Sequence, residues 1–354
     1  MAWIVLSSPG KGTHARGHRT TFSWVIGRGQ KYSQGNIMDV GKETSTKLSL
    51  IQQNIQKAIK GKPQVIQLAV ISLLARGHLL IEDVPGVGKT TLAQSLARSL
   101  NCSFRRIQFT SDMLPSDILG VSVYNPAIQD FEFKAGPIFS NVVLADEINR
   151  TSPKTQSALL EAMNESQVSV EKQTYALPRP FIVMATQNPM EYHGTFPLPE
   201  SQLDRFMMRI RMGYPDTEDE REILRTQSLN GSMESLDPVL SIEEVLQLQT
   251  LADRVQVDES LIDYVLRIVR ATRDHENLQL GVSPRGGLFL VKAARAMAFV
   301  QGRGYCIPDD IKAMTMPVLA HRVVVSGRPG GYGQDGDDAE RIIRDLVETV
   351  PVPL

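Results

Sequence analysis

The segment with the clearest chemical potential is a glycine-rich turn, EDVPGVGKTT, at residues 82–91. Small residues let backbone N–H groups curl around a phosphate, and the N-terminus of a following helix adds a favourable dipole. Lys89 would reach the β- and γ-phosphates of a nucleotide, and the Thr90 hydroxyl would hold Mg²⁺. The turn departs from the pattern G-x-x-x-x-G-K-[ST], because Asp83 stands where the first glycine is expected. The alternative interpretation is a tight turn with a chance lysine. The residues expected to contact the nucleotide are Pro85, Gly86, Val87, Gly88, Lys89, Thr90 and Thr91.

A second candidate is the acidic pair that ends the apolar run NVVLADE at residues 141–147. Such a run is typical of a buried strand, and α/β sheets bind ligands at the carboxyl ends of their strands. Asp146 would hold Mg²⁺, directly or through water, and Glu147 would polarise the water that attacks the nucleotide. Taken alone, an acidic pair after a strand is more often a helix cap. The phosphate loop upstream favours hydrolysis.

Polar side chains at further places would complete a nucleotide site. Asn188 ends the apolar run FIVMATQNP, where its amide would orient the attacking water, since nucleotide hydrolysis depends mostly on positioning and charge stabilisation. Before a proline it could instead be a turn-forming residue. Arg205 in LPESQLDRF and Arg285 in GVSPRGG are placed to contact phosphate, and Arg150 in DEINR is a weaker candidate. Each arginine could also be an ordinary ion-pair residue.

These residues belong to a regular alternation of apolar strands and helices. Five buried strands are predicted from the runs HLLIED, FRRIQF, NVVLADE, FIVMATQNP and MMRIRM, with helical patterns between them. Buried strands that alternate with helices indicate a parallel sheet covered on both faces. Two hairpins are predicted in addition, around residues 121–135 and 167–177.

The sequence pattern divides the chain into four parts. We expect a disordered N-terminal extension at residues 1–40 and an α/β nucleotide-binding core at 41–213. A linker with the first lid helix is expected at 214–240, and an all-helical lid domain at 241–354. Helices are predicted at 216–229, 241–253, 258–273, 285–301 and 308–322, and the low-complexity run GRPGGYGQDGDD at 327–338 predicts a mobile loop.

Composition excludes several classes of protein. The chain has 354 residues, of which 42% are hydrophobic and 22% charged, so it is neither fibrous nor disordered. No apolar run approaches the roughly 18 residues of a membrane-spanning helix. The two cysteines are far apart and have no partner for a disulfide or zinc pattern, which favours a reducing compartment, the cytoplasm. Residues 1–37 hold five basic residues and no acid, so the remainder has a formal charge of −6 and argues against nonspecific nucleic-acid binding.

The motifs together resemble a MoxR-type AAA+ ATPase. The matching segments are LLARGHLLIEDVPGVGKTTLAQSLA, VVLADEINRTSPKTQSALLEAM, ATQNPMEYHGTFPLPESQLDRF and GVSPRGGLFLVKAARAMAF, within about residues 42–325. The resemblance implies a P-loop NTPase sheet of order 5-1-4-3-2, an insert in helix 2, a hairpin before the sensor 1 strand, and a helical lid. It also implies site roles: Lys89 and Thr90 as Walker A, Asp146 and Glu147 as Walker B, Asn188 as sensor 1, Arg205 as arginine finger and Arg285 as sensor 2.

The resemblance further implies how such a protein acts. Members bind Mg-ATP, assemble as homo-oligomeric rings, usually hexamers, and act as chaperone-like remodellers of protein clients, often beside proteins with von Willebrand factor A domains. This chain shows no such domain, so that partner would be a separate protein. Three alternatives stay open: an ATPase subunit of a metal chelatase, a nucleic-acid motor of the same clade, and a nucleotide-sensing scaffold without turnover. The presence of both carboxylates and both arginines argues against the scaffold. The acidic body and the lack of an appended DNA-binding module count against the motor.

Overall fold

The computed structural model describes residues 24–26, 30–32, 34–171, 173–188, 194–225, 236–326 and 334–353. The chain divides into two units, Met1–Glu43 and Thr44–Leu354. In the first unit, strands β1 (Trp24–Ile26) and β2 (Gln30–Tyr32) pair in antiparallel fashion. Most of the predicted N-terminal extension lies outside the described residues. The first long helix is α1 (Gln34–Ala58), and its first residues fall within the range 1–40 that was predicted to be a disordered extension.

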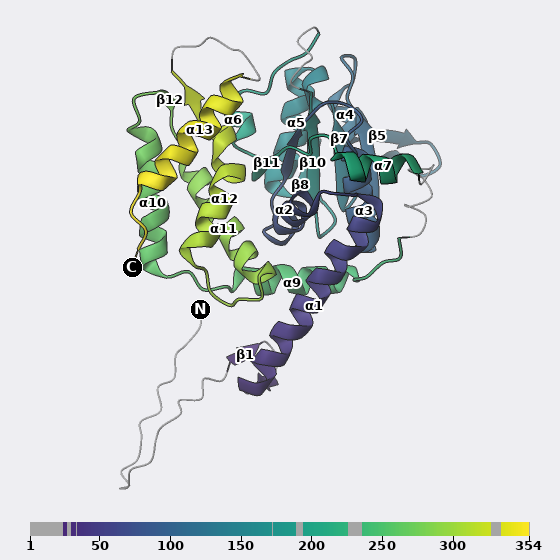
Figure 1. Ribbon diagram of the computed structural model, residues 1–354. Coiled ribbons are helices and arrows are strands. Elements are labelled where there is room, and N and C mark those ends of the chain that lie inside the picture. Colours follow the sequence, from purple (N-terminus) through teal and green to yellow (C-terminus); the bar gives the residue numbers. More distant parts are fainter. Residues whose placement is uncertain are drawn as a thin grey trace, which may run out of the picture. The chain divides into compact units, whose positions relative to one another are not determined.

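The second unit is built on one parallel sheet of five strands (Figure 1). Its order is β11-β3-β10-β7-β4, which in chain order of these strands is 5-1-4-3-2, as predicted. Every neighbouring pair in it is parallel. The strands are β3 (Leu79–Glu82), β4 (Phe104–Gln108), β7 (Val142–Asp146), β10 (Ile182–Gln187) and β11 (Met208–Ile210).

Apolar side chains alternate between the two faces of this sheet and bury both. Leu79 and Ile81 of β3 join the cluster on one face, whereas Leu80 joins the cluster on the other. Helices α1, α2 and α3 pack on the first face, and α4 and α5 supply the second. Fully burying a Leu or Ile stabilises the fold by about 1.5–3 kcal/mol. These helices are α2 (Pro63–Leu74), α3 (Lys89–Ser99), α4 (Pro115–Leu119) and α5 (Pro153–Glu165).

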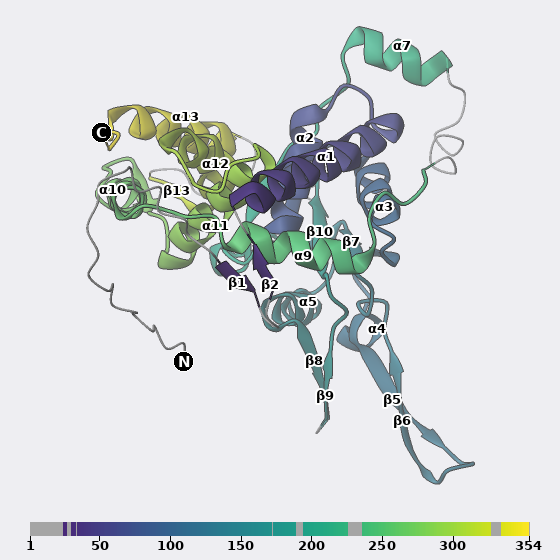
Figure 2. The same cartoon turned by 90° about the horizontal axis from the view of Figure 1, so that it is seen from below.

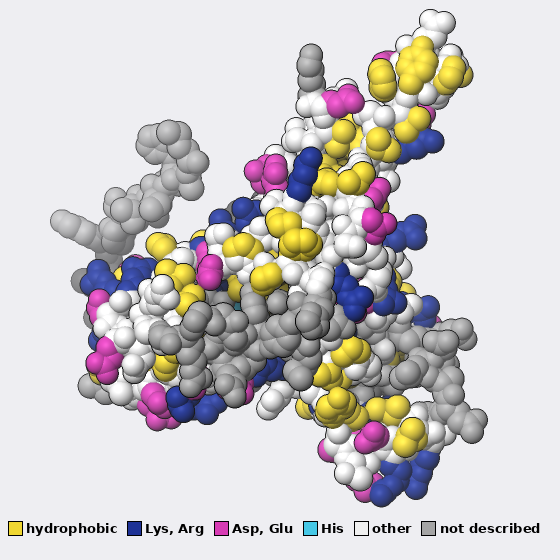
Figure 3. Space-filling model, turned by 90° about the horizontal axis from the view of Figure 1, so that it is seen from above, with side chains coloured by type: hydrophobic (Ala, Val, Ile, Leu, Met, Phe, Trp, Pro, Cys, Tyr) yellow, Lys and Arg dark blue, Asp and Glu magenta, His cyan; other side chains and the backbone are white. Residues whose placement is uncertain are grey.

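Two hairpins project from the sheet in the same direction (Figure 2). They are β5 (Gly120–Asn125) with β6 (Asp130–Ala135), and β8 (Gln167–Val170) with β9 (Gln173–Ala176), at the two predicted places. The rings of Phe133 and Tyr175 stack between them at 4.0 Å. Hydrophobic side chains gather along the longer projection (Figure 3), where the exposed ones are Val121, Val123, Tyr124, Ile128 and Phe131.

The carboxyl-terminal part is a lid of helices beside edge strand β11 (Figure 1). After α6 (Glu200–Leu203) and α7 (Thr217–Arg225) come α9 (Ile242–Asp253), α10 (Glu259–Arg273), α11 (Pro284–Val300), α12 (Pro308–Leu319), the 3₁₀ turn η2 (Ala320–Arg322) and α13 (Gln334–Thr349). Their starts follow the local sequence: Ser241 and Glu244, for example, form a reciprocal capping box on α9.

The lid differs from the sequence prediction in two respects. A short antiparallel pair, β12 (Leu278–Leu280) with β13 (Val324–Val325), adds strand to a domain expected to be all-helical. Helix α13 was not predicted, and its first turn falls in the run 327–338 that was expected to be a loop; residues 327–333 lie outside the described residues. None of the helices in the described part of the chain is long and apolar enough to cross a membrane.

Candidate functional site

The glycine-rich loop lies between a fully buried strand and a helix, as predicted. It follows β3, and Gly88 is the residue before the first turn of α3. Gly86 and Gly88 have φ of 86° and 96°, a left-handed conformation that glycine adopts without a Cβ penalty. Pro85 and Gly86 are exposed, so the loop is open to solvent. The ammonium group of Lys89 donates to the backbone oxygen of Asp83 at 2.7 Å.

The acidic pair lies at the carboxyl end of β7 and is held by polar neighbours. The Asp146 carboxylate accepts from the Arg106 guanidinium at 2.6 Å and from the Thr186 hydroxyl at 2.5 Å. Glu147 has φ of 59°, and its backbone N–H donates to the same hydroxyl at 2.9 Å. Its carboxylate accepts from the Gln108 amide at 2.7 Å. Arg150 forms an ion pair with that carboxylate at 3.1 Å.

The strand register brings the candidate groups to one edge of the sheet. β10 lies between β3 and β7, with Gln187 opposite Glu82 and Ala185 opposite Ala145. The residue after Gln187 is Asn188, which is buried at the end of the middle strand. The phosphate loop, Asn188 and the acidic pair therefore follow three consecutive strands at their carboxyl ends, where ligands bind in such sheets.

Arg205 lies at the opposite end of the sheet edge. It precedes β11, whose first residue, Met208, pairs with Leu79 at the start of β3. The phosphate loop follows Glu82 at the other end of β3, three residues or about 10 Å further along the strand direction. The Arg205 Nε is buried and has no hydrogen-bond partner among the residues that the structure describes. The structure thus separates Arg205 from the phosphate loop of its own chain.

Arg285 is exposed and lies beside the segment that carries Arg205. It is the second residue of α11, whose N-cap, Ser283, accepts from the Gly286 N–H at 3.2 Å. The Ser283 hydroxyl also contacts both carboxylate oxygens of Asp204, at 2.9 and 3.0 Å. The lid therefore holds Arg285 close to the residue that precedes Arg205.

A buried arginine of the lid fixes the same segment. Arg322 is 4% exposed and forms an ion pair with Asp204. Its guanidinium also donates to the backbone oxygens of Phe206 and Met207, and its Nε donates to the backbone oxygen of Val318 at 2.7 Å. Burial lowers the pKa of Arg322 to about 10, and Asp204 opposes that shift. At neutral pH this side chain is therefore a charged anchor between the lid and the sheet edge.

Sequence reasoning missed three polar residues of this site. Arg106 and Gln108 lie on a strand that was interpreted only as a structural element, and Thr186 lies within an apolar run. The sequence did contain a weak signal for two of them. Arg106 and Gln108 are polar and lie on one side of β4, whereas Ile107 between them is buried. This alternation, the period of a strand, places both polar side chains on the side that faces Asp146 and Glu147.

The donor set fits Mg²⁺ bound together with a nucleotide. Mg²⁺ prefers oxygen ligands and usually takes one or two protein groups, with phosphate oxygens and waters completing the shell. The Thr90 hydroxyl and the Asp146 carboxylate are oxygen donors of this kind. Asp146 already attracts a cationic group, since Nε and Nη2 of Arg106 both donate to its Oδ2. Its Oδ1 accepts from the Thr186 hydroxyl and has a second lone pair for a cation.

Two family models match separate parts of the chain. Residues 78–208 match the ATPase family associated with various cellular activities (AAA), and residues 270–346 match the AAA lid domain. The uncharacterized protein YeaC of Bacillus subtilis is 49% identical over 302 residues, which cover 85% of this chain and 93% of the relative. Chaperone MoxR1 of Mycobacterium tuberculosis is 41% identical over 310 residues, which cover 84% of this chain and 80% of the relative. A crystal structure from Cytophaga hutchinsonii, of a protein assigned to the ATPases, gives a TM-score of 0.82 at 36% identity and covers 90% of this chain and 99% of that one.

Proposed function

The chain belongs to the MoxR family of AAA+ ATPases, and on that premise we propose that it is a Mg-ATP-hydrolysing, ring-forming remodeller of protein complexes. One observation carries the hydrolytic part of this proposal. The phosphate loop, Asn188 and the acidic pair follow three consecutive parallel strands at the same edge of the sheet. That arrangement supplies phosphate-binding amides, a water-orienting amide and a carboxylate within one small region.

The described side chains divide the work of hydrolysis between them. The loop amides and Lys89 bind the β- and γ-phosphates, and Lys89 leaves the backbone oxygen of Asp83 to do so. Thr90 and Asp146 would hold Mg²⁺, which would supply positive charge against the phosphates. Glu147 accepts the proton of the attacking water, and Asn188 orients that water. Gln108 and Arg150 hold the Glu147 carboxylate until then.

The arginines serve the nucleotide of a neighbouring subunit in this proposal. Arg205 precedes the edge strand, at the end remote from its own phosphate loop, and Arg285 is held beside it through the contact of Ser283 with Asp204. A charged group so placed is of use to a nucleotide only if a second copy brings its own loop to this edge. The placement therefore supports a closed ring, with a hexamer as the expected size.

The apolar hairpin supports a protein rather than a nucleic acid as the client. Five large hydrophobic side chains of the β5–β6 projection are exposed (Figure 3). Exposed apolar groups in one place mark protein contacts, whereas nucleic-acid binding needs a basic surface. A separate von Willebrand factor A protein is the partner class we propose. The name of the relative MoxR1, a chaperone, agrees with this role.

Phosphate release from Mg-ATP by the purified chain, with a Lys89→Ala variant alongside, tests the proposal. The wild-type protein should release phosphate, and Lys89→Ala should lose nucleotide binding because the charge that compensates the phosphates is gone. If calorimetry shows that Lys89→Ala keeps micromolar affinity for ATP, the loop is not the phosphate-binding site. Strong stimulation of the wild-type ATPase by single-stranded DNA would favour the nucleic-acid motor instead.

A further inference from the structure

The phosphate loop begins with an aspartate where the P-loop pattern has glycine. Glycine at such a position usually allows a positive φ, or a close approach of the backbone that a side chain would prevent. Asp83 is not among the described non-glycine residues with positive φ, so the backbone at this position does not require glycine. The residue is only 9% exposed, so it packs into the site and is not directed into solvent.

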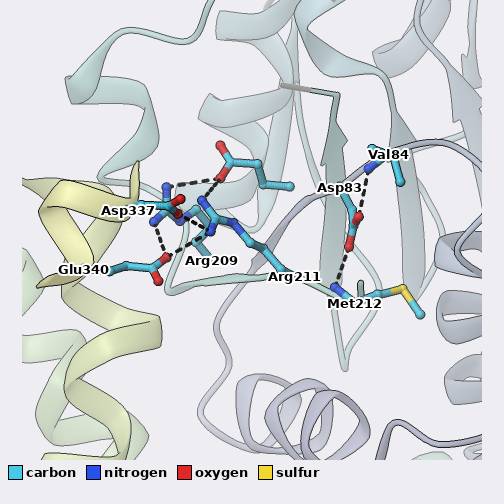
Figure 4. Close-up of polar contacts among 8 residues, drawn as sticks. Asp83, Val84, Arg209, Arg211, Met212, Asp337 and Glu340 are labelled. Carbon is cyan, nitrogen blue, oxygen red and sulfur yellow. Dashed lines mark hydrogen bonds and ion pairs between the residues drawn. The ribbon is translucent and has the colours of Figure 1, made fainter. Parts of the chain in front are cut away.

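The Asp83 carboxylate accepts three backbone N–H groups, one from the loop itself and two from the segment after β11. Figure 4 shows the contacts with Val84 and Met212. One oxygen accepts from Val84 at 2.8 Å, within the loop itself. The other accepts from Met212 at 2.6 Å and Gly213 at 2.7 Å, immediately after β11. Hydrogen bonds to a charged acceptor are roughly twice as strong as neutral ones, so these contacts hold both segments firmly.

The backbone of the same residue makes two more contacts. Its N–H donates to the Gln187 oxygen at the end of β10, at 3.1 Å, and its oxygen accepts the Lys89 ammonium at 2.7 Å. Asp83, the first residue of the loop, therefore holds the ends of β3, β10 and β11 together. It also sets the place where Lys89 lies before a nucleotide binds.

We propose that Asp83 is a positioning residue of the nucleotide site. Its carboxylate fixes the start of the phosphate loop against the end of β11, so that the loop amides are already arranged when phosphate arrives. Lys89 waits beside them at the Asp83 backbone oxygen. This inference rests on the proposed ATPase function and adds to it a specific cause of nucleotide affinity. Substitution by glycine, the residue of the P-loop pattern, should weaken binding here.

The neighbouring residue offers a matched control, because it has the same charge and different contacts. Glu82 forms ion pairs with Arg209 and Arg211 at 3.2 Å. Those arginines continue to Glu340 and Asp337 of α13 (Figure 4), away from the phosphate loop. A Glu82→Gln variant therefore removes a buried charge from the same strand end and leaves the Asp83 contacts in place.

The experiment measures Mg-ATP affinity by calorimetry and steady-state hydrolysis for wild type, Asp83→Gly, Asp83→Asn and Glu82→Gln. Asp83→Gly should lose about tenfold or more in affinity, the value of at least one charge-assisted hydrogen bond. Its KM should rise accordingly, with kcat changed by less than about threefold, because the hydrolytic groups lie on other strands. Asp83→Asn, which keeps one acceptor oxygen for Met212 and Gly213, should fall between Asp83→Gly and wild type. Glu82→Gln should bind within about twofold of wild type.

Three results would overturn the inference. Asp83→Gly could bind as tightly as wild type, or Glu82→Gln could lose as much affinity as Asp83→Gly, which would indicate general damage to the strand end. If Asp83→Gly does not fold, Asp83→Asn decides, and wild-type affinity in that folded variant would refute the role. A wild-type protein that binds no Mg-ATP would be a different failure, that of the proposed function, and this inference would fall with it.

Discussion

Glu147 is held in an uncommon backbone conformation by its neighbours. Its φ of 59° lies in the left-handed region, which costs a non-glycine residue about 1–3 kcal/mol and persists where surrounding contacts enforce it. Here the Thr186 hydroxyl accepts the Glu147 N–H and donates to Asp146. One hydroxyl thus holds the Asp146 carboxylate and the Glu147 backbone, a contact between strands that no local spacing in the sequence reveals.

A Glu147→Gln variant should bind Mg-ATP with near wild-type affinity and hydrolyse it about 10²–10⁴ times more slowly. The amide keeps the shape of the side chain and accepts the contact from Gln108, but it cannot take a proton from water. Calorimetry and single-turnover phosphate release separate the two effects. Glu161→Gln, the same change at an exposed position of α5, serves as the control. Equal losses of binding and turnover would make Glu147 structural, and near-normal turnover would place the base elsewhere.

At the scale of elements, the sequence predicted the helices and strands that local residue patterns determine. The five sheet strands, the loop between β3 and α3, and most lid helices follow from apolar runs, caps and glycines. Helix α13 was missed because its first turn is rich in Gly and Asp. Its later face, with Ile342, Ile343 and Leu346, is buried against the lid, and packing of that face overrides the weak local propensity.

The buried anchor between lid and sheet edge should dominate the stability of that junction. Arg322→Met should lower the free energy of unfolding by about 3–5 kcal/mol, because Asp204 and several backbone oxygens lose a buried cationic donor. Urea unfolding at pH 7 measures it. Arg267→Met, at an exposed arginine of the lid helix α10, should cost less than about 1 kcal/mol. A cost for Arg322→Met as small as that of the control would show that the junction is held by other contacts.

At the scale of the whole molecule, the candidate nucleotide-binding groups and Arg205 lie toward opposite ends of the strands. The loop, Asn188 and the acidic pair lie at the carboxyl ends of the strands, whereas Arg205 lies before the edge strand begins. The sheet order and the two hairpins agree with the family resemblance in the sequence. The pairing of Ser283 and Arg322 with Asp204 could not be predicted, because it joins residues about 80 and 118 positions apart through tertiary packing.

The most direct test of this account mixes two inactive variants, Arg205→Ala and Glu147→Gln. Each homogeneous ring should be folded and nearly inactive, since every site lacks either the arginine or the base. In equal mixtures, an Arg205→Ala subunit that receives the arginine of a Glu147→Gln neighbour has a complete site, so about a quarter of wild-type ATPase activity should return if subunits assemble at random in a closed ring. Well-formed mixed rings with no recovered activity would contradict action between subunits. An Arg205→Ala protein that is fully active on its own would contradict any role for the arginine.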